Sequence, residues 1–153
     1  MGGIVGAMKL EILMIELLLT CSLLGSVDFE IKNYQDLYRV PYQCKLIEEV
    51  QEWIPLINQY FQSESALALT VMYCESRGKE YATGYNNDGS IDQGLMQINS
   101  NTQDWLEEKI YKEKLDIYDP ETNIKVSSWI VRNIGNWSWW NSSKHCWGKY
   151  ATN

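Results

Sequence analysis

Residues 66–100 read ALALTVMYCESRGKEYATGYNNDGSIDQGLMQINS, and this stretch decides the fold. Its apolar first part has the spacing of a helix, which we expect Ser63 to cap and Gly78 to end. The polar part that follows contains Asp88-Gly89, a dipeptide typical of the tight turn in a β-hairpin. The centre of the chain is therefore predicted to be a helix that runs into a small hairpin.

Helical patterns lie on both sides of this centre. Apolar residues recur at helical spacing over 46–60, and Asn101 or Thr102 is expected to cap a helix farther along. Residues 119–121 (DPE) are a strong helix start, and Gly135 is expected to end that helix. The side chains expected to face the core are Leu69, Val71, Met72, Trp105, Leu106, Ile110, Ile124, Trp129, Ile130, Val131 and Ile134. Without repeats or linkers, the prediction is one α+β domain that is mostly α.

The N-terminus resembles a targeting segment. Residues 10–27 (LEILMIELLLTCSLLGSV) form a short apolar stretch after Lys9, which Glu16 interrupts. The stretch is too short for a comfortable membrane span, and it predicts a secretory signal over residues 1–27. An uncleaved membrane anchor and a buried helix are the alternatives. Residues 28–153 are then the working domain, and the protein is expected outside the cytoplasm, either secreted or periplasmic.

Charge and composition exclude several function classes. The chain of 153 residues has 13 Lys plus Arg against 20 Asp plus Glu, a net charge of −7. This acidic balance argues against a nucleic-acid partner, because phosphate binding needs clustered positive charge. Residues 1–27 hold one lysine and two glutamates, so the rest of the chain carries −6. No phosphate-binding loop motif occurs. We expect a monomer that needs no cofactor or metal.

Two carboxylates stand out as candidate catalytic groups. Glu75 lies at the predicted end of an apolar helix, where burial disfavours the charged form and raises the pKa. Asp92 lies on the hairpin among Ser, Asn and Gln side chains, which keep it ionised. Two acids in such contrasting surroundings can protonate a leaving oxygen and stabilise developing positive charge. From the residues alone, an ordinary surface acid at a helix end is the competing interpretation of Glu75.

Two linked motifs resemble the lysozyme superfamily. Residues 74–78 (CESRG) followed by Gly-Leu-Met-Gln-Ile at 94–98 resemble small lytic transglycosylases of the SLT type. The run at 88–100 (DGSIDQGLMQINS) resembles the c-type lysozymes, as does the position of Asp92, seventeen residues after Glu75. Residues 119–131 (DPETNIKVSSWIV) are similar to a later transglycosylase helix. The similarity spans about residues 45–140 and implies a lysozyme-like fold with a β-hairpin flanking the cleft.

The resemblance also implies an activity and two catalytic residues. The expected reaction is hydrolysis of the β-1,4 bond between N-acetylmuramic acid and N-acetylglucosamine in peptidoglycan, as a lysozyme (muramidase) performs it. The alternative is a lytic transglycosylase that leaves 1,6-anhydromuramyl ends. Glu75 matches the general acid that protonates the glycosidic oxygen. Asp92 matches the second carboxylate, as nucleophile or electrostatic partner, and favours hydrolysis.

Four further positions match substrate-binding or supporting residues of the superfamily. Ser76 is expected to orient the helix end around the acid. Gln97 and Asn99 are expected to line the cleft and contact the N-acetyl sugar. Gly94 is expected to let the backbone approach the sugar closely, because it has no side chain.

The chain departs from both family patterns in places. Gln93 stands where many c-type enzymes have tyrosine, and the c-type framework of eight cysteines is absent. Residues 136–147 (NWSWWNSSKHCW) replace the Ala-Tyr-Asn-x-Gly segment of transglycosylases. Export would leave Cys44, Cys74 and Cys146, which allows one disulfide and one odd thiol. Similarity to compact resuscitation-factor-like muralytic domains implies that Cys74 pairs with Cys146.

The sequence partly fits three other kinds of site. The hairpin loop resembles the middle of a calcium-binding EF-hand, but Gly84 and Leu95 occupy its first and last ligand positions. A thiol protease would use Cys74 with His145, yet the framing residues of such an enzyme are missing. A zinc site would use those two residues with Cys44 and Cys146, without the usual ligand spacing.

A second function class is a glycan-binding module that has lost turnover. The four tryptophans of the C-terminal segment suit either sugar stacking or the core, and the core was the favoured interpretation for some of them. They are Trp137, Trp139, Trp140 and Trp147. The presence of Glu75 argues for an enzyme, because binding alone needs no protonated acid.

Overall fold

The structure is a computed structural model that describes residues 46, 48–134 and 136–148. The chain divides into two compact units, Met1–Glu52 and Trp53–Asn153. The predicted signal, its boundary at residue 27 and the possible anchor all lie outside the described residues. No helix within the described ranges is long and apolar enough to cross a membrane. A 3-10 turn, η1 (Gln51–Trp53), leads into the second unit, which holds all the features below.

The second unit begins with two consecutive helices joined by a short turn. Helix α3 (Ile54–Phe61) is followed by the 3-10 turn η2 (Gln62–Glu64) and then by α4 (Ser65–Ser76). Helix α4 is buried along most of its length, including Leu69, Val71 and Met72, as predicted. This burial makes α4 the helix around which the unit packs.

Both ends of α4 differ from the prediction. Ser63 lies inside η2 instead of capping the helix, and no side chain caps the first turn. The hydroxyl of Ser65 instead donates to Gln62 O at 2.7 Å, which closes the preceding turn. At the other end, Arg77 rather than Gly78 takes the first left-handed position, with φ of 58°. The pattern therefore located the helix, while its ends were set by local hydrogen bonds.

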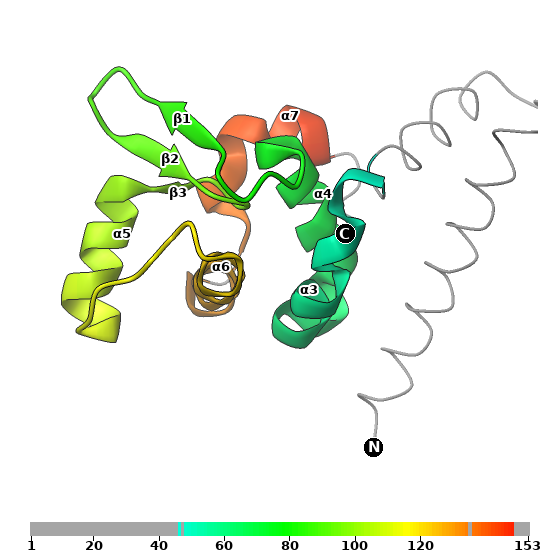
Figure 1. Cartoon of the computed structure of the whole chain (residues 1–153), viewed down its shortest axis with the longest axis horizontal. Coiled ribbons are helices and arrows are strands. Elements are labelled where there is room, and N and C mark those ends of the chain that lie inside the picture. Colours follow the sequence, from blue (N-terminus) through cyan, green and yellow to red (C-terminus); the bar gives the residue numbers. More distant parts are fainter. Residues whose placement is uncertain (1–45, 47, 135, 149–153) are drawn as a thin grey trace, which may run out of the picture. The chain divides into compact units, whose positions relative to one another are not determined.

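The predicted hairpin is present and belongs to a three-stranded sheet (Figure 1). Strands β1 (Thr83–Tyr85), β2 (Ile91–Gln93) and β3 (Ile98–Asn99) are antiparallel in that order. Gly89, with φ of +84°, occupies the turn between the first two strands. The register aligns Asp92 with Gly84 on one side and with Asn99 on the other. The third strand was not predicted, because two residues carry no alternation pattern.

Helix α5 (Ser100–Leu106) starts directly from β3 and continues into a π-helical turn, η3 (Glu107–Tyr111). Its cap is Asn99, whose side chain accepts from Asn101 N at 2.9 Å, and not Asn101 or Thr102 as predicted. Leu106 is buried as expected. Trp105 and Ile110 were expected in the core but are 38% and 37% exposed; Trp105 lies in α5 and Ile110 in the π-helical turn.

Helix α6 (Pro120–Ile134) begins where the sequence predicted it. Asp119 caps it by accepting from Thr122 N at 2.8 Å. Figure 1 shows α6 nearly end-on, between α3 and α5. Its buried face includes Ile124, Ile130 and Val131, whereas Ile134, expected to be buried, is 39% exposed in the last turn. Gly135, the predicted stop, lies outside the described residues.

The tryptophan-rich tail closes the core. It forms the 3-10 segment η4 (Ser138–Ser143) and the short helix α7 (Lys144–Trp147). Three of its indoles are buried against the helices, and these are Trp137, Trp140 and Trp147. The Cys74–Cys146 disulfide, with an S–S distance of 2.00 Å, joins α7 to the last turn of α4. The tail is thus fixed next to Glu75 in this α+β, lysozyme-like arrangement.

Candidate active site

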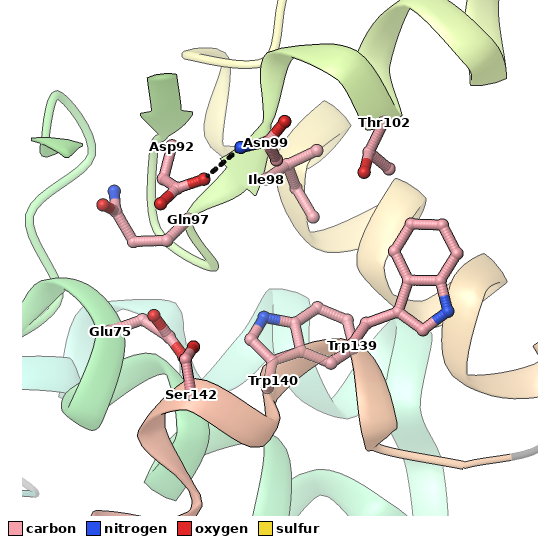
Figure 2. Close-up of a pocket in the computed structure, with 9 residues that line it drawn as sticks. All are labelled: Glu75, Asp92, Gln97, Ile98, Asn99, Thr102, Trp139, Trp140 and Ser142. Atoms are coloured by element: carbon pink, nitrogen blue, oxygen red, sulfur yellow. Dashed lines mark hydrogen bonds between the residues drawn. The ribbon is translucent and has the colours of Figure 1, made fainter. Parts of the chain in front are cut away.

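A polar pocket lies where the end of α4, the sheet, the start of α5 and η4 meet (Figure 2). Glu75 faces it from the helix side and Asp92 faces it from the sheet side. Most of the lining side chains can donate or accept hydrogen bonds, which suits a hydroxyl-rich ligand. The residues that line it are Glu75, Asp92, Gln97, Ile98, Asn99, Thr102, Trp139, Trp140 and Ser142.

Glu75 has the environment that the sequence predicted for an acid. It stands on the last turn of α4, directly after the disulfide-bonded Cys74. Burial raises the pKa of Glu75 from 4.5 to about 7, and the negative charge of Asp92 acts in the same direction. A hydrogen bond from the Ser143 hydroxyl to Oε1, at 2.5 Å, opposes part of this increase in the pKa. Glu75 can therefore be protonated near neutral pH and can transfer this proton to a bound ligand.

Asp92 is held as a hydrogen-bond acceptor. Its Oδ1 accepts from Asn99 Nδ2 at 2.8 Å, and its Oδ2 accepts from Asn86 Nδ2 at 3.0 Å. Ser90 Oγ in turn accepts from both amides, at 2.9 Å from Asn99 and 3.3 Å from Asn86. The pocket therefore joins the half-buried Glu75 to a carboxylate whose two oxygens are held by amide donors.

Gln97 lines the pocket through an unusual backbone position. Its φ is 49°, in the left-handed region, and its Nε2 donates to Ala82 O and Gly94 O at 3.0 and 2.9 Å. Oε1 accepts no bond from within the described ranges and is the atom left for a ligand. A Cβ on Gly84 would lie 3.1 Å from this Oε1, so Gly84 leaves room for the amide.

The other predicted binding residues are placed differently from one another. Asn99 lines the pocket, caps α5 and donates to Asp92. Ser76 is buried outside the pocket lining, where its hydroxyl donates to Met72 O at 3.3 Å. Gly94 also lies outside the lining and has φ of +74°. A Cβ there would come within 2.4 Å of Asn123 Nδ2, so the close approach is to Asn123.

Asn123 on α6 supports the loop that follows the strand of Asp92, and no sequence motif marked it. Its Oδ1 accepts from Met96 N at 2.9 Å. Its Nδ2 donates to Gln93 O at 3.0 Å and to Ile117 O at 2.9 Å. The residue is completely buried. One side chain thus fixes the loop between the strand of Asp92 and the turn of Gln97.

The residues that the sequence missed come mainly from the tail. Ser142 and Ser143 lie in the segment that departs from the family pattern, so no motif marked them. Trp139 and Trp140 lie in the same segment and were expected either to stack on sugars or to join the core. Trp140 is buried and donates from Nε1 to Met96 O at 2.7 Å, which ties η4 to the sheet side. Trp139 is 41% exposed and also lines the pocket.

The competing sites gain no support from this geometry. Cys74 is bonded to Cys146, which removes both the thiol nucleophile and two of the thiolates of a zinc site. Asp88, in the loop that resembles an EF-hand, bonds instead to Ser90 N and Oγ at 3.0 and 2.7 Å. Among the described residues, no group of three His, Cys, Asp or Glu side chains could hold a metal ion.

The helical unit with a small sheet, a half-buried acid at a helix end and an opposing carboxylate define a lysozyme-like protein. The family model of the Transglycosylase SLT domain matches residues 54–140, more than half of the chain. The chain belongs to this family. Its members are peptidoglycan-cleaving glycosidases, the class that the motifs around Glu75 predicted.

The similar curated proteins carry the name Invasion protein IagB. Those from Salmonella typhimurium, strains SL1344 and LT2, are 38% identical over 85 residues, which cover 54% of this chain and 53% of the relative. The protein from Salmonella typhi is 38% identical over 77 residues, covering 50% of this chain and 48% of the relative. The matched part thus spans about half the length of these relatives. No solved structure matches the chain significantly.

Proposed function

We propose that this protein cleaves the β-1,4 bond between N-acetylmuramic acid and N-acetylglucosamine in peptidoglycan, with Glu75 as the general acid. The observation that carries the proposal is the Glu75 carboxyl, whose pKa burial raises to about 7, in a pocket shared with Asp92. An acid with a pKa near the working pH transfers a proton most effectively. Family membership supplies the substrate class.

The chemical step begins with proton transfer from Glu75 to the glycosidic oxygen. The bond between that oxygen and C1 of the muramic sugar then breaks, and positive charge develops at C1 and the ring oxygen. Asp92 approaches from the sheet side of the pocket with two amides behind it, and its negative charge stabilises this developing cation.

For the second half of the reaction we propose internal attack, as the name of the family indicates. The 6-hydroxyl of the muramic sugar attacks C1, and the Glu75 carboxylate accepts the hydroxyl proton. The acid is thereby regenerated, no water is consumed, and the product carries a 1,6-anhydro ring. One carboxyl group that serves first as acid and then as base is sufficient for this sequence.

Hydrolysis is the second candidate, and the position of Asp92 favours it. A second carboxylate that faces the acid across the pocket can stabilise a longer-lived cation or bond to C1, so that water completes the reaction. The product then has a reducing end and contains one added water. A non-catalytic glycan-binding module is the third alternative, and the raised pKa of Glu75 argues against it.

Mass spectrometry of the products from purified peptidoglycan distinguishes these candidates, with Asp92→Asn as the informative variant. Transglycosylation predicts 1,6-anhydro muropeptides from the wild type, and the same products at reduced rate from the variant. Reducing-end muropeptides, heavier by one water, would establish hydrolysis and make Asp92 a working partner. Binding of wall fragments without any cleavage would overturn the enzymatic proposal.

The sugar contacts follow from the pocket lining. We propose that Trp139 stacks on a sugar ring, while Asn99 and Gln97 Oε1 contact an N-acetyl group. The place of action is proposed to be outside the cytoplasm, where the Cys74–Cys146 disulfide persists. A secreted and a periplasmic location both satisfy this condition.

A further inference from the structure

Within the described part of the chain, the side chain that hydrogen-bonds to the acid is that of Ser143. Its Oγ lies 2.5 Å from Glu75 Oε1. Ser143 is the last residue of η4, inside the tail that replaces the usual transglycosylase segment. The contact is therefore a property of this chain's own C-terminal segment and was not marked by any family motif.

The surrounding hydrogen bonds determine where the single Ser143 proton points. Trp147 Nε1 donates to Ser143 Oγ at 3.0 Å and occupies one of its lone pairs. Two acceptors remain for the hydroxyl, Glu75 Oε1 at 2.5 Å and Trp140 O at 3.0 Å. Trp147 has a single indole N–H, which Ser143 Oγ and Trp140 O share, each 3.0 Å from Nε1. The shorter bond, to a group that carries charge when ionised, takes the proton.

This assignment makes the two oxygens of Glu75 unequal. Oε1 accepts the Ser143 hydroxyl, so a proton on Oε1 would face another proton. Oε2 accepts no hydrogen bond from within the described ranges. While Ser143 donates to Oε1, the acid proton therefore resides on Oε2, and a general acid is effective only when its proton is on the oxygen that reaches the substrate.

We propose that Ser143 is a positioning residue that directs the transferable proton of Glu75 to Oε2. This inference rests on the proposed role of Glu75 as the acid. Ser143 needs no contact with the sugar to act in this way, because its effect passes entirely through the Glu75 carboxyl.

The fold holds Ser143 and Glu75 together from both directions. Trp147, buried one turn farther along α7, fixes the hydroxyl from behind. Cys146, three residues after Ser143, is bonded to Cys74, which immediately precedes Glu75. The donor and the acceptor are thus held by two links, one covalent, and this rigidity is what a fixed proton position requires.

The same bond has a consequence that can be titrated. Ser143 stabilises the ionised form of Glu75 and lowers its pKa, against the larger effect of burial. Removing the hydroxyl therefore raises the Glu75 pKa. A charge-assisted hydrogen bond of this kind corresponds to about one pKa unit. The activity of a protonated acid disappears above its pKa, so the alkaline limb of the activity profile moves upward as well.

The test compares Ser143→Ala, Ser143→Thr and Ser138→Ala. The last makes the same change on an exposed residue of η4 outside the pocket lining. Carbon-13 NMR titration of the Glu75 carboxyl, without substrate, measures the pKa in each protein. Profiles of kcat/KM against pH on peptidoglycan fragments measure the limb. We expect both to rise by about one unit in Ser143→Ala, with kcat about tenfold lower at pH 5.5. Ser143→Thr and Ser138→Ala should match the wild type.

An unchanged Glu75 pKa in Ser143→Ala would overturn the proposal, and so would a lower rate with the alkaline limb in its original place. A decrease of kcat in Ser143→Ala that also occurs in Ser143→Thr would contradict the proposal as well. Failure of the proposed function would give a different result. Glu75→Gln would then still cleave peptidoglycan, while NMR titration would still show a higher Glu75 pKa in Ser143→Ala than in the wild type.

Discussion

At the scale of single residues, the site depends on side chains that sequence motifs marked and on others that they did not. The contrast of Glu75 with Asp92 could be predicted, because an apolar helix and a polar hairpin surround them in the sequence itself. Asn123 and Ser143 could not be predicted. Their importance arises from contacts across 27 residues to Met96 and across 68 residues to Glu75, which no local pattern reveals.

Asn123 is expected to carry a large part of the local stability. Its side chain bonds to one N–H and two carbonyl groups of buried residues, so Asn123→Ala removes three buried hydrogen bonds. We expect a loss of about 2–4 kcal/mol in the free energy of unfolding, measured by urea denaturation. The matched control is Asn133→Ala, an exposed residue of the same helix, which should change stability by less than about 0.5 kcal/mol. Equal losses in the two variants would contradict the role of Asn123.

Glu75 is expected to make stability depend on pH. Its pKa is about 7 in the folded protein and 4.5 as the ordinary value, so the folded state binds more protons between these limits. Stability from this group is fully present below pH 4.5 and is lost as the pH rises through about 7. Glu75→Gln should remove this dependence and stabilise the protein at pH 8, by about 1–3 kcal/mol in thermal or urea unfolding. A variant less stable than wild type at pH 8 would show that Glu75 is not strained by burial.

At the scale of elements, turn and cap chemistry determined what could be predicted. The Asp88-Gly89 turn and the Asp119-Pro120 start are local signals, and both elements are present. The cap of α5 was misplaced by two residues or more, because Asn99 also belongs to strand β3. The tail gave no helical period, since its indoles pack on several helices at once.

Asn99 connects an element to the chemistry, and two substitutions separate its roles. It caps α5 through Oδ1 and donates to Asp92 through Nδ2. Asn99→Ala removes these two bonds together with the one to Ser90 Oγ, and loss of the cap should cost about 1 kcal/mol of stability. Asn99→Ser restores a cap without the amide, so stability should return while kcat/KM stays lowered. Denaturation and activity assays on both variants check this, and recovery of full activity in the serine variant would exclude a role for the amide.

At the scale of the whole molecule, the prediction of a mostly helical, lysozyme-like fold is confirmed. The order of the helices and the hairpin follows from patterns spread over 66–134. The position of the tail did not follow, because it depends on a disulfide that closes a separation of 72 residues. Resemblance to other families implied this pairing, whereas the spacing of the cysteines could not.

The disulfide is expected to stabilise the fold and to keep Ser143 next to Glu75. A cross-link across 72 residues reduces the conformational entropy of the unfolded chain. In the loop-entropy model this raises the free energy of unfolding by about 4 kcal/mol. Reduction of the wild type should lower the urea midpoint and the activity together, because the covalent link between the segments that carry Glu75 and Ser143 is lost. The double variant Cys74→Ser, Cys146→Ser should have a lower urea midpoint and a lower activity than the oxidised wild type. Neither quantity should change further when reductant is added. A reduced wild type with an unchanged midpoint would contradict this role.

The net charge of −7 is expected to slow encounter with an anionic wall. Salt screens this repulsion over about 10 Å at 0.1 M, so kcat/KM on intact walls should rise modestly from 10 to 100 mM salt. Short neutral glycan fragments serve as the control and should show little dependence. Activity on walls that increases strongly as salt is lowered would contradict the repulsion.

The most direct single measurement is the rate of soluble fragment release from purified peptidoglycan by the wild type and by Glu75→Gln at pH 6. Glutamine keeps the shape of the side chain and removes the transferable proton. We expect the variant to lose at least about 100-fold in kcat while it remains folded and still binds the wall. A Glu75→Gln protein that releases fragments at a rate close to that of the wild type would show that Glu75 is not the acid.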